Sequence, residues 1–188
     1  MIKVEVTYTA PDYVRERTKR ALTKDEIKQY LDELNEELRS MEVKGELCLY
    51  GGAVMALVYD ARPDTKDVDA IFKPSTQIRE AAAKVANINH LRSDWLNDAV
   101  KGFLVPHQQR ILFDLSNLKI FVPEADYLLA MKAISARSNT LDAADVRFLI
   151  DLLQIRSADA VLDIVEKYYP RQQIKPATQF FIEELFEQ

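Results

Sequence analysis

Two aspartates separated by one apolar residue have the spacing in this sequence that most clearly suggests chemistry. Asp67 and Asp69 flank Val68 in a segment that alternates polar and apolar residues, which predicts a β-strand. Residues two apart in a strand point to the same face, so both carboxylates would lie close together on one face. Two neighbouring negative charges are costly unless a cation lies between them. Because Mg²⁺ typically takes one or two carboxylates together with substrate phosphate oxygens, the pair indicates a magnesium–phosphate site.

Two consecutive glycines come shortly before this pair in the sequence. Residues 46–50 are strand-like, Gly51 and Gly52 follow, and the apolar residues 53–59 predict a helix. Glycines let a backbone approach a ligand, and a helix start presents free N–H groups to an anion. Each motif alone would also fit an ordinary helix start or an exposed acidic strand. In this order they favour a phosphate cradle opposite a metal site, as phosphoryl or nucleotidyl transfer requires.

The complete pattern resembles the signature of the DNA polymerase β-type nucleotidyltransferase superfamily. After the two glycines it reads Arg62-Pro63-Asp64-Thr65-Lys66-Asp67-Val68-Asp69. The resemblance implies that Asp67 and Asp69 bind two divalent cations, Mg²⁺ or Mn²⁺. It implies nucleotide binding by Gly51, Gly52, Arg62, Thr65 and Lys66. A third metal-binding carboxylate usually comes from a later strand, and Asp114 is the candidate here, although an edge-strand aspartate that faces water is an equally good interpretation.

Later segments are similar to motifs of the AbiEii/MenT-type bacterial nucleotidyltransferase toxins. In these segments Lys132 lies within residues 127–137, and Asp142 and Asp145 follow. The resemblance implies that Lys132 and Asp145 act as catalytic residues. Many relatives have Gly-Ser at the position of Gly51-Gly52, so this chain has no serine hydroxyl there.

Residues 95–101 also look like a segment of the small members of that group. Ser93 is a suitable N-cap for a helix over residues 94–103, on which Asn97 and Lys101 would share one face. That face would either be solvated or hold the base and phosphate of a nucleotide.

Lys132 is unusual for its position on the expected helix. On a helical wheel it falls between Leu128 and Leu129, inside an apolar face. A lysine there either extends its ammonium to water or meets an anion. Asp142 and Asp145 are less informative, because aspartates in a first helical turn are ordinary capping residues.

The order of the expected elements predicts an α+β protein. Strands and helices mix up to residue 122, and only helices follow, at 127–137, 142–155, 158–169 and 177–186. Thr23 to Glu26 form a capping box before the first helix, and residues 110–115 and 118–122 predict a hairpin. The resemblance implies a nucleotidyltransferase fold, a small mixed sheet flanked by helices, over residues 1–122. A C-terminal helical bundle over residues 123–188 would contribute Lys132 to the site.

The composition excludes several classes of protein. The chain has 188 residues, one Cys, two His and four Gly. The single cysteine excludes an internal disulfide and a multi-cysteine zinc site, and the histidines are too far apart for a His-x-x-x-His site. The glycine spacing excludes a Walker A loop, a dinucleotide-binding G-x-G-x-x-G motif and a G-x-S-x-G elbow.

Charge and apolar runs bear on location and partners. The net charge of −5 argues against a surface covered with basic residues for DNA, but leaves room for a local basic patch. The first residues contain no charged segment that leads into an apolar run, and the longest apolar run, residues 53–59, is too short to span a bilayer. We therefore expect a cytoplasmic protein without membrane contact.

These patterns together predict a magnesium-dependent enzyme that moves a nucleoside monophosphate from an NTP to an acceptor hydroxyl. The toxin resemblance implies the 3′ end of tRNA as acceptor and a neutralising antitoxin protein as partner. An RNA acceptor needs a basic lane. The candidates are Arg15, Arg17, Lys19, Arg20, Lys167, Arg171 and Lys175. A small molecule or a protein side chain stays open as acceptor, and so does a catalytically silent interaction protein.

Overall fold

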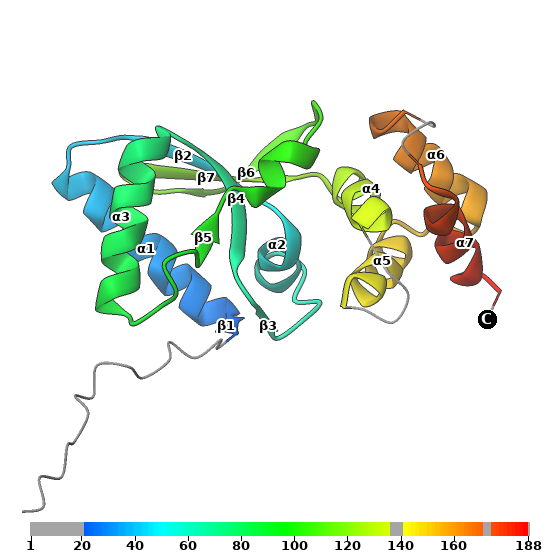
Figure 1. Ribbon diagram of the computed structural model, residues 1–188, viewed down its shortest axis with the longest axis horizontal. Coiled ribbons are helices and arrows are strands. Elements are labelled where there is room, and N and C mark those ends of the chain that lie inside the picture. The colour runs from blue at the N-terminus through cyan, green and yellow to red at the C-terminus, as the bar shows by residue number, and fades with distance from the viewer. Residues whose placement is uncertain (1–20, 136–140, 171–173, 188) are drawn as a thin grey trace, which may run out of the picture.

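A five-stranded mixed sheet forms the centre of the first two thirds of the chain (Figure 1). The structure is a computed structural model that describes residues 21–135, 141–170 and 174–187. The sheet order is β5-β4-β2-β7-β6, from Leu96–Asn97, Val68–Lys73, Gly45–Leu49, Leu118–Pro123 and Gln109–Asp114. Strand β2 pairs antiparallel with β4 and parallel with β7, and β6 and β7 form the predicted hairpin. The predicted α+β class is therefore confirmed.

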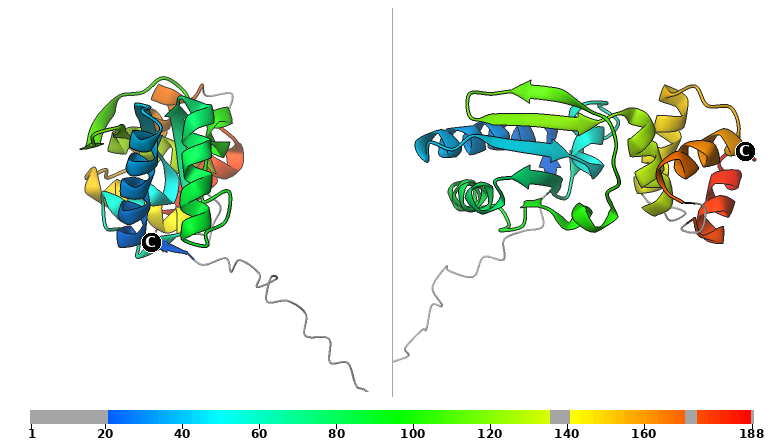
Figure 2. Two further views of the ribbon diagram at one scale, coloured as in Figure 1. Left: turned by 90° about the vertical axis from the view of Figure 1, so that its left-hand side faces the viewer. Right: turned by 90° about the horizontal axis from the view of Figure 1, so that it is seen from above.

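Helices α1 (Lys24–Ser40) and α3 (Ser75–Ile88) lie side by side against one face of this sheet (Figure 2). The capping box predicted at Thr23 and Glu26 is present at the start of α1. The apolar stripe of α1 is buried, together with Leu47 and Leu49 of β2 and Val68 and Ala70 of β4. Because strand residues alternate between faces, β2 and β4 turn their remaining residues to the opposite face.

The opposite face of the sheet carries a second, smaller cluster. Cys48 of β2 and Tyr50, which directly follows that strand, pack there with Tyr127, Leu104 and Val105. This face also receives Asp69, since Val68 and Ala70 are buried on the α1 side. The alternation predicted around Asp69 is thus present in the structure, and Asp67 lies just before the strand.

The helix expected over residues 94–103 is absent, and this prediction was wrong. The segment instead forms β5 and the 3₁₀-helix η2 (Ala99–Phe103). Trp95 is buried, its indole N–H donates to the Ala82 carbonyl, and its own carbonyl accepts from the Val68 N–H. These long-range contacts pair the segment with β4 and override its local helix signals. Asn97 and Lys101 therefore do not share a helix face.

Within the described residues, four helices follow the sheet, as the sequence predicts. They are α4 (Ala125–Ser135), α5 (Leu141–Leu152), α6 (Ala158–Tyr168) and α7 (Pro176–Glu184). Helix α4 packs against α5, α6 and α7. None of the helices in the described ranges is long and apolar enough to cross a membrane. The division at residue 122 into two domains stays a prediction.

Three smaller elements complete the fold. Helix α2 (Gly51–Leu57) follows β2 directly, and the two-residue strands β1 (Leu22–Thr23) and β3 (Asp64–Thr65) pair with each other just before Asp67. The strand expected at residues 2–8 lies outside the described residues. So do five residues of the candidate basic lane, namely Arg15, Arg17, Lys19, Arg20 and Arg171.

Candidate active site

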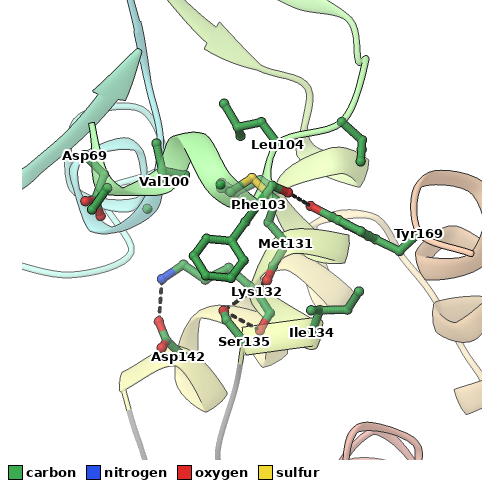
Figure 3. A pocket seen from close by; sticks show the side chains of 15 residues that line it. Asp69, Val100, Phe103, Leu104, Met131, Lys132, Ile134, Ser135, Asp142 and Tyr169 are labelled. Carbon is green, nitrogen blue, oxygen red and sulfur yellow. Dashed lines mark hydrogen bonds and ion pairs between the residues drawn. The ribbon is translucent and has the colours of Figure 1, made fainter. Parts of the chain in front are cut away.

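A cavity of about 580 Å³ is lined by residues of the sheet, η2 and the C-terminal helices (Figure 3). Gly51, Asp69, Lys132 and Asp142 contribute the charged and backbone part of its lining. Apolar side chains contribute most of the rest: Val100, Phe103, Leu104, Val105, Leu128, Met131 and Ile134. The cavity thus has a polar end at the predicted site residues and an apolar wall beside it.

Asp69 is the carboxylate of the predicted pair that faces this cavity. It is half-buried as the second residue of β4, and Asp67 precedes the strand. Burial raises the pKa of Asp69, and the nearby negative charge of Asp67 raises it further. A hydrogen bond from the Asn97 side chain and the positive charge of Lys132 act in the opposite direction. The net rise in pKa means that burial and the charge of Asp67 together outweigh the Asn97 hydrogen bond and the charge of Lys132.

The carboxylates of Asp67 and Asp69 fit a divalent cation whose remaining ligands come from the substrate. No group of three or more His, Cys, Asp or Glu residues within the described ranges is arranged to hold a metal ion. Mg²⁺ needs fewer protein ligands than that, because it usually binds one or two carboxylates and takes further oxygens from phosphate and water. A cation beside the pair would also offset the burial and the repulsion from Asp67 that together raise the pKa of Asp69.

Neighbouring atoms leave no room for a side chain at either Gly51 or Gly52. Gly51 has a φ of +59°, and a Cβ there would lie 2.8 Å from Oδ2 of Asp69. At Gly52 a Cβ would overlap the side chains of Arg62 and Thr65. Arg62 and the buried Thr65 therefore occupy the space that the serine of the resembled toxins would need. Both side chains lie directly beside Gly52, and neither lines the cavity.

Lys132 connects the cavity with a chain of buried charges. Its Nζ lies 2.5 Å from Oδ1 of Asp142 and 2.8 Å from Oδ2 of Asp145. Arg62 Nη1 lies 3.3 Å from the same Asp145 oxygen. Lys132 is only 6% exposed and Asp145 only 3%. The lysine predicted to reach water or meet an anion therefore meets two carboxylates, and Arg62 connects them to the glycine segment.

The segment that forms part of the apolar wall is held by an aromatic stack. The ring of His107 lies parallel to that of Tyr127, with centroids 3.7 Å apart. His107 Nδ1 lies 2.7 Å from the Val105 carbonyl, to which it donates, so Nε2 is left to accept from the Tyr50 hydroxyl at 3.1 Å. Burial lowers the pKa of His107, which favours this neutral form. His107 thus fixes Leu104 and Val105 in place and does not itself line the cavity.

The third carboxylate expected from Asp114 is wrongly placed to join Asp69. Asp114 pairs in register with Lys119, Lys119 with Glu46, and Glu46 with Lys73, the last residue of β4. Asp69 is the second residue of that strand. It therefore lies roughly 13 Å from Lys73 along β4 at the usual rise per residue. Strand β6 runs antiparallel to β7, β7 runs parallel to β2, and β2 runs antiparallel to β4. The C-terminal end of β6, where Asp114 lies, is therefore at the opposite end of the strands from Asp69. There Asp114 forms an ion pair with Lys119 at 3.2 Å.

The other predicted residues, Asn97, Lys66 and Lys101, do not line the cavity. Asn97 lies opposite Asp69 on β5, and Lys66 is exposed just before Asp67. Lys101 is exposed on η2 and lies outside the lining. Sequence reasoning missed Phe103 and Tyr169, because both were assigned only to expected helices. In the sequence, the apolar residues around Lys132 were the local signal for the apolar wall of the cavity.

Residues 26–181 match the model of the family DUF6036, described as nucleotidyltransferases of unknown function. The chain belongs to this family. The match spans most of the chain and includes every predicted site residue from Gly51 to Asp145. No curated protein and no solved structure matches the chain significantly. The narrower similarity to AbiEii/MenT-type toxins stays a prediction.

Substitution of Asp69 by Asn should raise the melting temperature of the DUF6036 nucleotidyltransferase in EDTA at neutral pH. The raised pKa means that the folded state binds the Asp69 proton more readily than the unfolded chain. The wild type therefore loses stability as pH rises from the ordinary carboxyl pKa of 3.8 through the raised pKa, and asparagine removes that loss. Thermal denaturation at a series of pH values measures the difference, which should vanish at low pH.

Asp94→Asn is the matched control, because Arg92 lowers the pKa of that carboxyl. Its effect on the melting temperature should be absent or of opposite sign. An Asp69→Asn protein that is less stable than the wild type in EDTA at neutral pH would show that burial and the charge of Asp67 do not destabilise the Asp69 carboxylate.

Substitution of Lys132 by Met should destabilise the DUF6036 nucleotidyltransferase by about 3–5 kcal/mol, because it leaves the buried Asp145 with too little positive charge. The double variant Lys132→Met/Asp145→Asn should recover part of this loss, since it also removes the unpaired charge. Urea denaturation measures both. Lys167→Met is the control lysine, because its ion pair with Asp126 lies at the surface. Equal stability of Lys132→Met and wild type would contradict the assigned ion pairs.

Proposed function

We propose that this nucleotidyltransferase moves a nucleoside monophosphate from an NTP to an acceptor hydroxyl, with Asp67 and Asp69 as ligands of Mg²⁺ or Mn²⁺. The observation that carries the proposal is the position of Asp69 at the polar end of the cavity, with its pKa raised beside Asp67 and next to Gly51 and Lys132. When bound, the cation would neutralise phosphate charge and lower the pKa of the acceptor hydroxyl. The family description supports this reaction class.

The residues of the chain have separable tasks in this proposal. The backbone of Gly51 and of Gly52, beside which Arg62 and Thr65 lie, would face the triphosphate. Lys132 would exchange Asp142, its more exposed partner, for a phosphate oxygen and keep its ion pair with Asp145. The acceptor hydroxyl releases its proton to water as its oxygen forms a bond to the α-phosphorus, the bond from the α-phosphorus to the bridging oxygen breaks, and pyrophosphate leaves. Positive charge at Lys132 stabilises that leaving group.

We further propose the 3′ end of tRNA as acceptor and a toxin role for the enzyme, with an antitoxin protein as partner. The support for the tRNA acceptor, the toxin role and the antitoxin partner is the similarity of the segments around Lys132 and Asp145 to the AbiEii/MenT-type toxins. Within the described part of the basic lane, Lys175 is exposed and Lys167 forms an ion pair with Asp126. Binding of tRNA through such residues should weaken as the salt concentration rises.

The experiment that tests the function is nucleotide transfer to total bacterial tRNA. The protein is incubated with Mg²⁺, tRNA and each α-³²P-labelled NTP in turn, and the products are separated on a denaturing gel. We expect label on the tRNA band, none with γ-³²P-labelled NTP, and none with the Asp67→Ala variant. Replacement of Asp67, which is half-buried just before β4, should leave the fold intact.

Each other result has a defined meaning. Label on the protein or on a small molecule, but not on RNA, would contradict the tRNA acceptor and keep the transfer reaction. Transfer by a variant in which both Asp67 and Asp69 are replaced by Ala would contradict the site assignment.

A further inference from the structure

We propose that the apolar wall of the cavity binds the base of the incoming nucleotide and that the ring of Phe103 is the surface on which this base stacks. The inference rests on the proposed function, because it takes the polar end of the same cavity as the phosphate site. It adds a residue and a mode of base recognition to that site.

Phe103 is a large apolar residue that is 71% exposed, and its ring lines the cavity. Isolated exposed apolar residues are ordinary on a protein surface. Phe103 differs from them because its ring faces a concave space beside Val100 and Lys132 (Figure 3). An aromatic face presented to a cavity is the group that binds a flat heterocycle by stacking.

The backbone of Phe103 is held although its side chain is free. The hydroxyl of Tyr169 donates to the Phe103 carbonyl at 3.2 Å, which connects the end of η2 to the residue that follows α6. A Cβ added at the neighbouring Gly102 would have no other heavy atom within 4 Å. The ring therefore stands on a fixed backbone with open space next to it.

A nucleotide fits this arrangement better than a purely apolar ligand does. Gly51, Asp69 and Lys132 line one end of the cavity, and Val100, Phe103 and Met131 line the wall beside them. A nucleoside triphosphate carries the same sequence of groups, with a charged phosphate chain at one end and a flat base with apolar faces at the other. The cavity of about 580 Å³ is within the usual range for a ligand of that size.

The polar side chains along the wall are already engaged in hydrogen bonds. The Tyr169 hydroxyl donates to the Phe103 carbonyl, and the Ser135 hydroxyl donates to the carbonyls of Met131 and Lys132. Among the described lining residues, no side-chain hydrogen-bond donor along the apolar wall is left for the edge of a base. Stacking tolerates every base, whereas strong discrimination requires hydrogen bonds to its edge. We therefore expect the affinities of the four NTPs to lie within about tenfold of one another.

Equilibrium binding of each Mg²⁺–NTP, without acceptor, tests this inference by calorimetry. Phe103→Ala should weaken NTP binding by roughly 5- to 150-fold, the range that corresponds to the loss of one base stack. Phe103→Trp should retain the affinity. Phe180→Ala is the matched control, because Phe180 is 70% exposed on α7 and lies outside the lining. Mg²⁺–tripolyphosphate, which has no base, should bind the wild type and Phe103→Ala equally.

The outcomes separate this inference from the function on which it rests. Wild-type protein that binds NTPs and transfers nucleotides, together with a Phe103→Ala variant of equal NTP affinity, would overturn the inference and leave the function standing. A Phe103→Ala variant that loses affinity only for the acceptor would also overturn it, since the ring would then hold the acceptor. A wild type without NTP binding or transfer would overturn both.

Discussion

The paired charges of Arg62, Asp145 and Lys132 are the interaction on which the candidate site depends. Arg62 lies between α2 and β3, Lys132 on α4 and Asp145 on α5, so the ion pairs join the sheet side of the site to the helical side. A buried charge is tolerated only when it is paired and hydrogen-bonded. The three side chains therefore restrict how the helices after the sheet lie against the glycine segment.

This arrangement explains why the glycines and the lysine belong to one site although they are distant in sequence. Arg62 occupies the space beside Gly52 and holds Asp145, and Asp145 in turn holds Lys132 at the edge of the cavity. The positive charges of Arg62 and Lys132 are largely neutralised by the carboxylates with which they pair. The repulsion between Asp67 and Asp69 is not removed, which is consistent with a site that gives up stability for binding a cation and its phosphate ligand.

Local sequence patterns predicted the parts of the structure that depend on local physics. The capping box at Thr23, the alternation around Asp69 and the apolar position of Lys132 follow from strand and helix periodicity. The segment from Ser93 to Phe103 could not be predicted in this way, because contacts of Trp95 with distant residues determine its structure. Asp114 was misplaced for a related reason. Its distance from Asp69 depends on strand direction and register, which its own neighbours in sequence do not encode.

The most direct measurement of the central claim is anomalous diffraction from crystals grown with Mn²⁺ and an NTP analogue that cannot be cleaved. The account predicts a manganese peak within coordination distance of the carboxylates of both Asp67 and Asp69, with the phosphates of the analogue completing its ligands. An ordered triphosphate in the cavity without manganese beside these two aspartates would contradict the account.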